Sequence, residues 1–233
     1  MKVVSFKICP FVQRVTALLE AKNIAYELEY IRLDDKPQWF LDISPHGQVP
    51  VLITDGGTAL FESDAIVEYI EESKGALQPE LSLEEKAANR AWSYLASKNY
   101  LVQCGAQRSP DQDALKERSG KLDQAFDKIE KQLGDTPFFG GDVIGMVDIA
   151  WLPLLHRANI IERRSGFDFV GDRPKLKKWQ NQLMETGLAE KSVAADFDEA
   201  FSAFYLSDQT FIGRGGDARC CSPAKGRATA SCC

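Results

Sequence analysis

The chain has 233 residues and a net charge of −6, with 44% hydrophobic and 27% charged side chains. This length is enough to bury a sizeable core in one or two domains. The negative charge argues against nucleic acid or an anionic membrane surface as a partner. No segment has the order of basic, apolar and small residues that a signal peptide needs, and none reads as a membrane span, so we expect a cytoplasmic protein.

The cysteines do not form the framework of a small disulfide-rich domain. Four of the six lie in the last 14 residues, which leaves Cys9 and Cys104 in the body of the chain. The sequence contains no CxxC pair, and His46 and His156 belong to no metal motif. We therefore expect no metal cofactor.

The first third of the chain alternates between strand and helix patterns. Apolar residues recur at helical spacing in residues 10–23 and 63–73, where Ser63 is the expected N-cap. Asp55-Gly56-Gly57 predicts a turn between two short strands. The expected order is strand 2–6, helix 10–23, strand 25–33, helical turns 36–42, strands 49–54 and 58–61, and helix 63–73. This order is typical of a small mixed sheet with helices packed on it.

Helical patterns dominate the rest of the chain. Residues 75–82 contain Gly75 and Pro79 without periodicity, which indicates a linker. Five helices are then expected, over residues 83–107, 111–134, 146–162, 174–186 and 190–206. An all-α domain over 83–212 would therefore follow an α/β domain over 1–74. Residues 213–233 have almost no large apolar side chain, so we expect this tail to be disordered.

Cys9 stands where the first strand meets the first helix. The unpaired N–H groups of a helix's first turn favour an anion, so a thiolate here should have a pKa below the free value of about 8.5. Pro10 suits the first helical position, where its missing N–H would have had no partner. Lys7 and Arg14 add positive charge nearby. A buried structural cysteine is the alternative, but Cys-Pro at this junction favours a nucleophile.

The fourth position of the motif that begins at Cys9 is Val12, not a second cysteine. No thiol therefore lies one helical turn away, and an internal disulfide of the CxxC kind cannot form. A mixed disulfide on Cys9 has to be released by an external thiol. This requirement indicates a small-thiol cofactor.

Four motifs resemble the omega-class glutathione transferases in order and spacing, and a fifth segment resembles the second-domain signature of the same superfamily. They are Cys9-Pro10-Phe11-Val12-Gln13-Arg14, Lys36-Pro37-Gln38-Trp39-Phe40, Gly47-Gln48-Val49-Pro50-Val51-Leu52, Phe61-Glu62-Ser63, and the segment from Phe138 to Asp148. The plant-type dehydroascorbate reductases and the intracellular chloride-channel proteins look similar in the same region. The resemblance covers residues 2–206 and implies a thioredoxin-like N-terminal domain followed by an all-helical C-terminal domain.

The resemblance also implies a glutathione site. Its residues would be Phe11, Lys36, Val49, Pro50, Glu62 and Ser63. A cis bond between Val49 and Pro50 would turn the Val49 backbone toward the cysteinyl part of glutathione. Glu62 and Ser63 would hold the γ-glutamyl end, and Lys36 would pair with the glycyl carboxylate. An ordinary strand proline, N-cap and solvated lysine are the alternatives for the single positions, but the set together favours the site.

The second-domain motif departs from its family pattern at one position. Gly145 stands where the pattern has Ser or Thr, three residues before Asp148. Glycine is an acceptable N-cap, and Asp148 can still accept a hydrogen bond from a backbone N–H. Asp148 is therefore interpreted as structural.

The second substrate is expected between the domains, against helix 83–107 and the C-terminal helix. Possible wall residues are Trp92, Tyr94, Tyr100, Phe204 and Tyr205. Aromatic residues at helical spacing belong more often to the core, which is the preferred interpretation for each of them.

These features predict glutathione-dependent thiol transfer, with glutathione as co-substrate and Cys9 as nucleophile. The resemblance implies that dehydroascorbate reduction fits the same cycle, that conjugation of glutathione to electrophiles is weaker, and that the protein is a homodimer. Two non-catalytic alternatives remain, a glutathione-binding or ligand-binding protein of the same fold and a membrane-inserting protein like the chloride-channel relatives. The charges of Lys7, Arg14 and Glu20 argue against membrane insertion.

Overall fold

A mixed sheet of four strands organises the first part of the chain. In the computed structural model, which describes residues 1–216, the strand order is β2-β1-β3-β4. β1 (Lys2–Ser5) runs parallel to β2 (Glu27–Tyr30) and antiparallel to β3 (Val51–Ile53), and β3 pairs antiparallel with β4 (Ala59–Phe61). β2 is shorter than predicted because it is an edge strand that pairs only with the four residues of β1.

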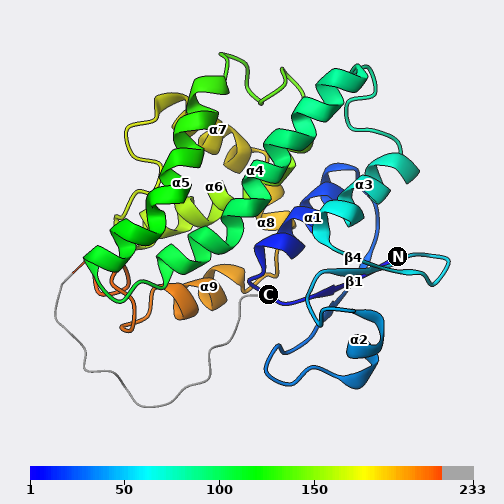
Figure 1. The fold of residues 1–233 in the computed structure, drawn as a ribbon, viewed down its shortest axis with the longest axis horizontal. Coiled ribbons are helices and arrows are strands. Elements are labelled where there is room, and N and C mark those ends of the chain that lie inside the picture. The colour runs from blue at the N-terminus through cyan, green and yellow to red at the C-terminus, as the bar shows by residue number, and fades with distance from the viewer. Residues whose placement is uncertain (217–233) are drawn as a thin grey trace.

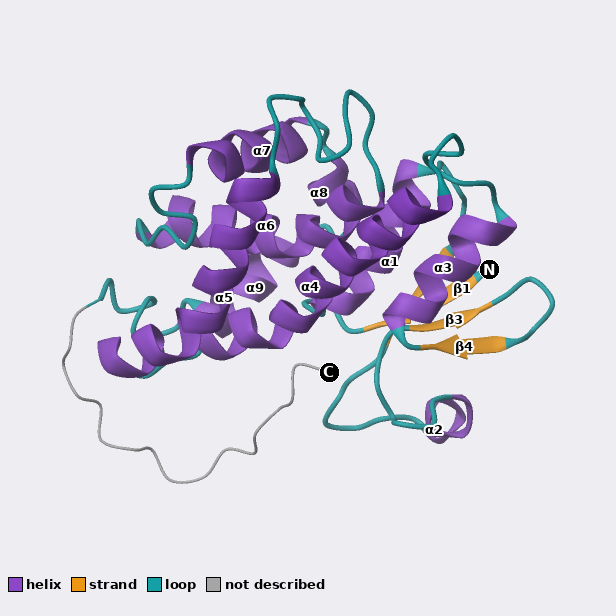
Figure 2. Cartoon of the chain, turned by 45° about the horizontal axis from the view of Figure 1, so that its top comes forward, coloured by secondary structure: helices purple, strands orange, loops and turns teal. Residues whose placement is uncertain are grey.

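Three helices accompany the sheet. α1 (Pro10–Ala21) and α3 (Ser63–Ser73) lie on one face, and the short α2 (Gln38–Ile43) lies on the other (Figure 2). The order of strands and helices is the predicted one, and it confirms a thioredoxin-like N-terminal region.

α3 has its predicted bounds, but its N-cap residue differs from the prediction. Ser63 is the first helical residue and is buried, whereas Glu62 is the N-cap, with a φ of 65°. The chain passes from β4 into α3 through this single left-handed residue. Because the turn falls at Glu62, Ser63 is already helical and its side chain does not cap the helix.

The rest of the described chain is helical, and its buried residues join those of the first part in one hydrophobic core. The helical C-terminal domain is thereby confirmed (Figure 1). Its helices are α4 (Leu83–Gln107), α5 (Gln112–Gln132), α6 (Met146–Ser165), α7 (Pro174–Glu185), α8 (Leu188–Lys191) and α9 (Phe197–Tyr205). Within residues 1–216, no helix is long and apolar enough to cross a membrane.

The single helix predicted over residues 190–206 is wrong, because the chain forms α8 and α9 with a break between them. Ser192 lies at the break, and its carbonyl oxygen accepts a hydrogen bond from the Thr16 hydroxyl of α1 at 2.6 Å. Its own hydroxyl donates to the Ala189 carbonyl at 3.0 Å. The buried contact with α1 therefore coincides with the end of α8, and a local apolar pattern cannot reveal it.

Asp148 holds the start of α6. Its carboxylate accepts hydrogen bonds from the backbone N–H of Gly145 at 2.8 Å and of Phe139 at 3.0 Å, and from the Trp179 indole N–H at 2.7 Å. Burial raises the pKa of Asp148 to about 6, so the group is ionised at neutral pH. These contacts agree with the structural role predicted for it.

The Gln78 side chain lies against Gly145. A Cβ placed on Gly145 would lie 2.3 Å from the side-chain oxygen of Gln78, which comes from the linker between α3 and α4. The Gln78 side chain therefore occupies the space that a serine or threonine N-cap would need. The linker thus packs directly against the loop that begins α6.

The first residues of the predicted tail, 213–216, belong to the described part of the chain. Gly213 N–H donates to the Thr210 hydroxyl at 3.0 Å, and Gly216 N–H donates to the Phe211 carbonyl at 2.9 Å. Residues 213–216 therefore make hydrogen bonds, and the rest of the predicted tail lies outside the described residues.

Candidate active site

Cys9 is the N-cap of α1 and Pro10 is its first helical residue, as expected. The Cys9 Sγ atom lies 3.9 Å from the Val49 carbonyl oxygen, and the peptide bond between Val49 and Pro50 is cis, also as expected. The side chain of Cys9 is buried, with 2% of the residue exposed. The structure therefore brings together the helix start, the thiol and the Val49–Pro50 turn.

The two cations expected to act on Cys9 are both paired with carboxylates. Lys7 forms an exposed ion pair with Asp196 at 2.6 Å, which lowers the pKa of Asp196. The buried Arg14 guanidinium pairs with Asp64 of α3. Each positive charge is thus largely compensated, which the sequence alone does not show.

A small cavity of about 100 Å³ opens where α1, α3 and the turn before β3 meet. Five of the six residues that the resemblance assigns to glutathione line it, namely Phe11, Val49, Pro50, Glu62 and Ser63. Ser44, His46, Gln48, Phe61 and Leu101 complete the lining. Residues from three separate motifs therefore meet at one cavity.

The start of α3 gives this cavity the character of an anion site. The first helical hydrogen bond runs from Ile66 N–H to the Glu62 carbonyl at 2.9 Å, so the N–H groups of the residues between them lie at the helix start. Glu62 is exposed and has a left-handed φ of 65°, a conformation that side chains other than glycine rarely adopt. Such backbone outliers concentrate at ligand sites.

Lys36 is not among the residues that line the cavity. Its ammonium lies against Gly47 and would be 3.7 Å from a Cβ placed there. Gly47 stands between the lining residues His46 and Gln48. Lys36 is therefore a residue of the rim.

Several residues that line the cavity were not predicted from the sequence as site residues. Gln48 belongs to a family motif but is not among the predicted site residues. Its loop is held by the Ser44 hydroxyl, which donates to the Gln48 carbonyl at 2.9 Å and accepts from the Gln48 N–H at 3.0 Å. The exposed Leu101 comes from α4, in the second domain. No local pattern could have placed Leu101 here, because its contact with the cavity depends on domain packing.

A second crevice, of about 390 Å³, lies between the two domains. Its walls come from the loop before Cys9, the end of β2 and the following loop, and α9, and include the aromatic side chains of Phe6, Tyr30 and Phe204. Phe204 thus lies on a wall, whereas Tyr100 and Tyr205 are fully buried core residues. α9 contributes to this crevice as expected, but α4 does not.

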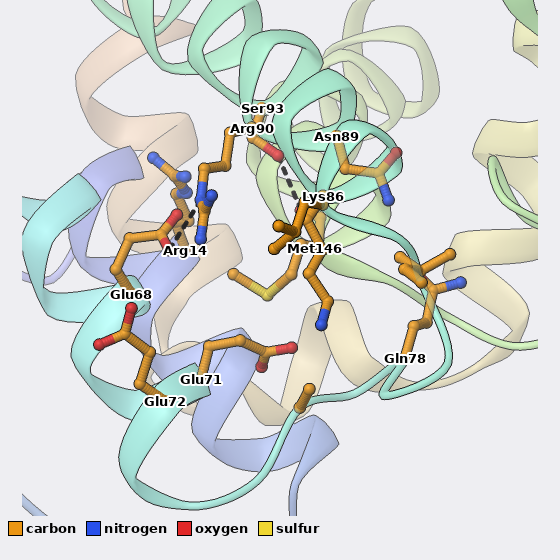
Figure 3. Close-up of a pocket in the computed structure, with 13 residues that line it drawn as sticks. Arg14, Glu68, Glu71, Glu72, Gln78, Lys86, Asn89, Arg90, Ser93 and Met146 are labelled. Carbon is orange, nitrogen blue, oxygen red and sulfur yellow. Dashed lines mark hydrogen bonds and ion pairs between the residues drawn. The ribbon is translucent and has the colours of Figure 1, made fainter.

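A third cavity, of about 380 Å³, lies between α3, the linker and α4 (Figure 3). Its lining is strongly charged, with the ion pair of Arg90 and Glu68 on one side and Lys86 near Met146. Of the residues discussed for Cys9, only Arg14 reaches it. In the described part of the chain, no group of three His, Cys, Asp or Glu side chains is placed to hold a metal ion.

Comparison with known proteins identifies the family. Residues 3–79 match the glutathione S-transferase N-terminal domain, and residues 112–179 match the glutathione S-transferase C-terminal domain. The chain is 31% identical over 215 residues to glutathione S-transferase omega-1 of Rattus norvegicus, a match that covers 89% of this chain and 87% of the rat protein. The chain belongs to the glutathione S-transferase family.

Other glutathione S-transferases support this assignment. Glutathione S-transferase DHAR2 of Arabidopsis thaliana is 35% identical over 154 residues, which cover 65% of this chain and 68% of the plant protein. The crystal structure of rice GST1 in complex with glutathione superposes with a TM-score of 0.75 at 22% identity and covers 91% of this chain and 94% of the rice chain. The rice structure confirms the glutathione S-transferase fold.

Proposed function

We propose that this glutathione S-transferase is a glutathione-dependent thiol transferase whose nucleophile is Cys9. The observation that carries the proposal is the position of Cys9 as N-cap of α1, with its sulfur 3.9 Å from the Val49 carbonyl and Val12 one turn away. A thiol at this position replaces the hydroxyl that would hold glutathione's own sulfur for conjugation. The similarity to omega-1 and DHAR2 transferases supports the same choice.

Glutathione would lie across the cavity that Phe11, Val49, Pro50, Glu62 and Ser63 line. The Glu62 carboxylate would receive the γ-glutamyl amine, and the α3 start with Ser63 would receive the γ-glutamyl carboxylate. The Val49 backbone would pair with the cysteinyl residue. Lys36, at the rim, would pair with the glycyl carboxylate as a mobile point charge.

The reaction needs one nucleophile and one external thiol. The Cys9 thiolate attacks the glutathionyl sulfur of a mixed disulfide, so that a Cys9–glutathione disulfide forms and the substrate leaves as a thiolate that takes a proton. The thiolate of a second glutathione then attacks the same glutathionyl sulfur. Oxidised glutathione leaves and the Cys9 thiolate is restored. In dehydroascorbate reduction, the same two glutathione molecules would supply the two electrons.

The crevice between the domains is the proposed place of the second substrate. Its aromatic and aliphatic walls fit a small, oxidised or electrophilic molecule with an apolar body, and Lys7 and Arg32 stand at its polar side. Conjugation of glutathione to electrophiles is expected as a weak additional activity.

Substitution of Cys9 tests the proposal. Cys9→Ser should abolish turnover of a glutathione mixed disulfide, because a hydroxyl cannot form a disulfide, and it should leave glutathione binding intact. Cys104→Ser is the matched control, since Cys104 is the other cysteine of the described residues and lies in α4. Turnover by Cys9→Ser close to that of the parent would refute the proposal.

A non-catalytic glutathione-binding protein is the second candidate, and the burial of Cys9 favours it, because only 2% of the residue is exposed. The same assay separates the two functions. A binding protein would take up glutathione, yet the parent itself would show no turnover and carry no glutathione on Cys9 after treatment with oxidised glutathione.

We also propose that the protein is a cytoplasmic homodimer without nucleic-acid or membrane partners. Closed twofold dimers are the commonest oligomers, and the exposed apolar side chains of Phe61, Leu83 and Leu101 are available to an interface. Light scattering at micromolar concentration should give twice the chain mass of 25.9 kDa. A species of 25.9 kDa alone would contradict the dimer.

A further inference from the structure

A buried guanidinium from the second domain reaches the loop that carries Cys9. Arg157 of α6 is fully buried, and its Nη2 donates to the Ile8 carbonyl oxygen at 3.2 Å. Its Nη1 donates to the Gln13 side-chain oxygen and to the Pro153 carbonyl at 3.1 Å. Because Ile8 precedes Cys9, Arg157 holds the peptide unit that leads into the reactive residue.

The three acceptors of Arg157 are neutral. Among residues 1–216, no carboxylate lies within ion-pair distance of it, and its Nε has no hydrogen-bond partner. The equally buried Arg14, on the first domain, differs because Asp64 neutralises it. Lys7 is likewise paired, with Asp196. Arg157 is therefore the buried cation of this region whose charge no carboxylate compensates; its guanidinium carbon lies 5.3 Å from the centroid of the Phe197 ring.

Arg157 and Cys9 both act on the buried Tyr100 hydroxyl. Burial raises the pKa of the Tyr100 hydroxyl, Arg14 and Arg157 act to lower it, and Cys9 acts to raise it. Arg157 and Cys9 therefore lie within electrostatic range of one buried hydroxyl. His156 stays neutral, since burial and Arg157 lower its pKa to about 3.

An uncompensated charge in a protein interior is costly unless an anion faces it. Of the groups around Arg157, the Asp64 carboxylate is already paired with Arg14, and Tyr100 is held neutral by burial. The Cys9 thiol is the remaining group of this set that can become an anion. Its ionised form would gain from both the helix start and the guanidinium.

We infer that Arg157 is a positioning residue for Cys9, which fixes the Ile8–Cys9 peptide and supplies the positive charge that stabilises the Cys9 thiolate. The inference rests on the proposed function, because it assigns the activation of that nucleophile to the second domain. Docking of α6 against α1 would then be part of the activation of Cys9.

The test is the pH dependence of alkylation of Cys9 by iodoacetamide, followed by mass spectrometry of the Cys9 peptide. Arg157→Met should raise the apparent pKa of Cys9 by about one unit, so that alkylation near pH 6 becomes about tenfold slower. Arg157→Lys keeps the charge and should retain most of the parent's profile. Arg164→Met, an exposed arginine of the same helix that pairs with Asp198, is the matched control and should leave the profile unchanged.

A second variant covers the case in which Arg157→Met does not fold. Gln13→Glu puts a carboxylate where the Gln13 side-chain oxygen now accepts a hydrogen bond from Arg157. This carboxylate would neutralise the guanidinium and should therefore also raise the pKa of Cys9. A folded Arg157→Met or Gln13→Glu protein with the parent's profile would overturn the inference. So would equal shifts in Arg157→Met and Arg157→Lys, or a parent pKa at or above the free value of about 8.5.

Alkylation measures the fraction of Cys9 present as thiolate and does not require turnover. The proposed function of Cys9 and its activation by Arg157 can therefore be refuted independently. If Cys9→Ser keeps thiol transfer, the proposed function fails, although Arg157 can still depress the Cys9 pKa. If the pH dependence of Cys9 alkylation is the same with and without Arg157 while Cys9→Ser is inactive, Cys9 is still the nucleophile, but its activation by the second domain is wrong.

Discussion

Replacement of Asp148 should destabilise the protein more than any other single substitution in the second-domain motif, residues 138–148. The carboxylate is fully buried and accepts three N–H donors, from Phe139, Gly145 and Trp179. Asp148→Ala leaves all three donors without that acceptor. Since each buried unsatisfied donor costs about 1–3 kcal/mol and some rehydrate, we expect a loss of about 3–5 kcal/mol. For a chain of this size, that loss lowers the melting temperature by about 10 °C or more.

A graded variant sharpens the test. Asp148→Asn keeps an oxygen for the Phe139 and Trp179 donors but turns an NH₂ group toward the Gly145 N–H, so the loss should be about 1–2 kcal/mol. Asp142→Asn, an exposed neighbour in the same loop, should change stability by less than about 0.5 kcal/mol. Urea unfolding at pH 7.5 measures all three variants. A loss below about 1 kcal/mol for Asp148→Ala, or equal losses for the alanine and asparagine variants, would refute this account of the hydrogen bonds.

Two further predictions concern binding and pH. Glu62→Ala should weaken glutathione binding at least about tenfold and Lys36→Ala less than about fivefold, because a charge-assisted contact at a helix start outweighs a mobile surface pair; equal dissociation constants in calorimetric titration would count against the site. Burial lowers the pKa of His156 from 6.5 to about 3 in the folded protein, so below pH 6.5 the unfolded chain binds a proton at His156 that the folded protein does not. The free energy of unfolding is therefore unaffected by His156 above pH 6.5 and decreases as the pH drops below that value. In urea unfolding, the parent should therefore lose about 2 kcal/mol more stability between pH 7.5 and pH 5 than the His156→Gln variant.

The sequence predicted the ends of those helices whose ends depend on neighbouring residues in the chain. The bounds of α3 and α4 match the prediction, and α4 begins with a capping box in which Glu85 N–H donates to the Ser82 hydroxyl and Ser82 N–H donates to the Glu85 carboxylate. The break between α8 and α9 was missed because the hydrogen bond from Thr16 to Ser192 spans 176 positions.

The same distinction applies to the candidate site. The resemblance to omega-class glutathione transferases placed Cys9, the Val49–Pro50 turn and Ser63 in one site. The end of β1, the start of β3 and the end of β4 lie at the same end of the sheet, where these residues stand. Arg157 was not recognised, since its contact with Ile8 joins residues 149 positions apart and an arginine in an amphipathic helix is ordinarily a surface residue. The compensation of Arg14 by Asp64 was hidden for the same reason.

The burial of α1 on every side determines how the molecule should unfold. Residues 12–19 are all buried, under α3 and the sheet on one side and under α6 and α8 on the other (Figure 1). One helix is therefore core to both halves, and neither half can complete its interior without the other. Calorimetry should show a single transition whose calorimetric and van't Hoff enthalpies agree, and a chain ending before α4 should not fold alone. Two resolved transitions would show instead that the halves fold independently and only dock through α1.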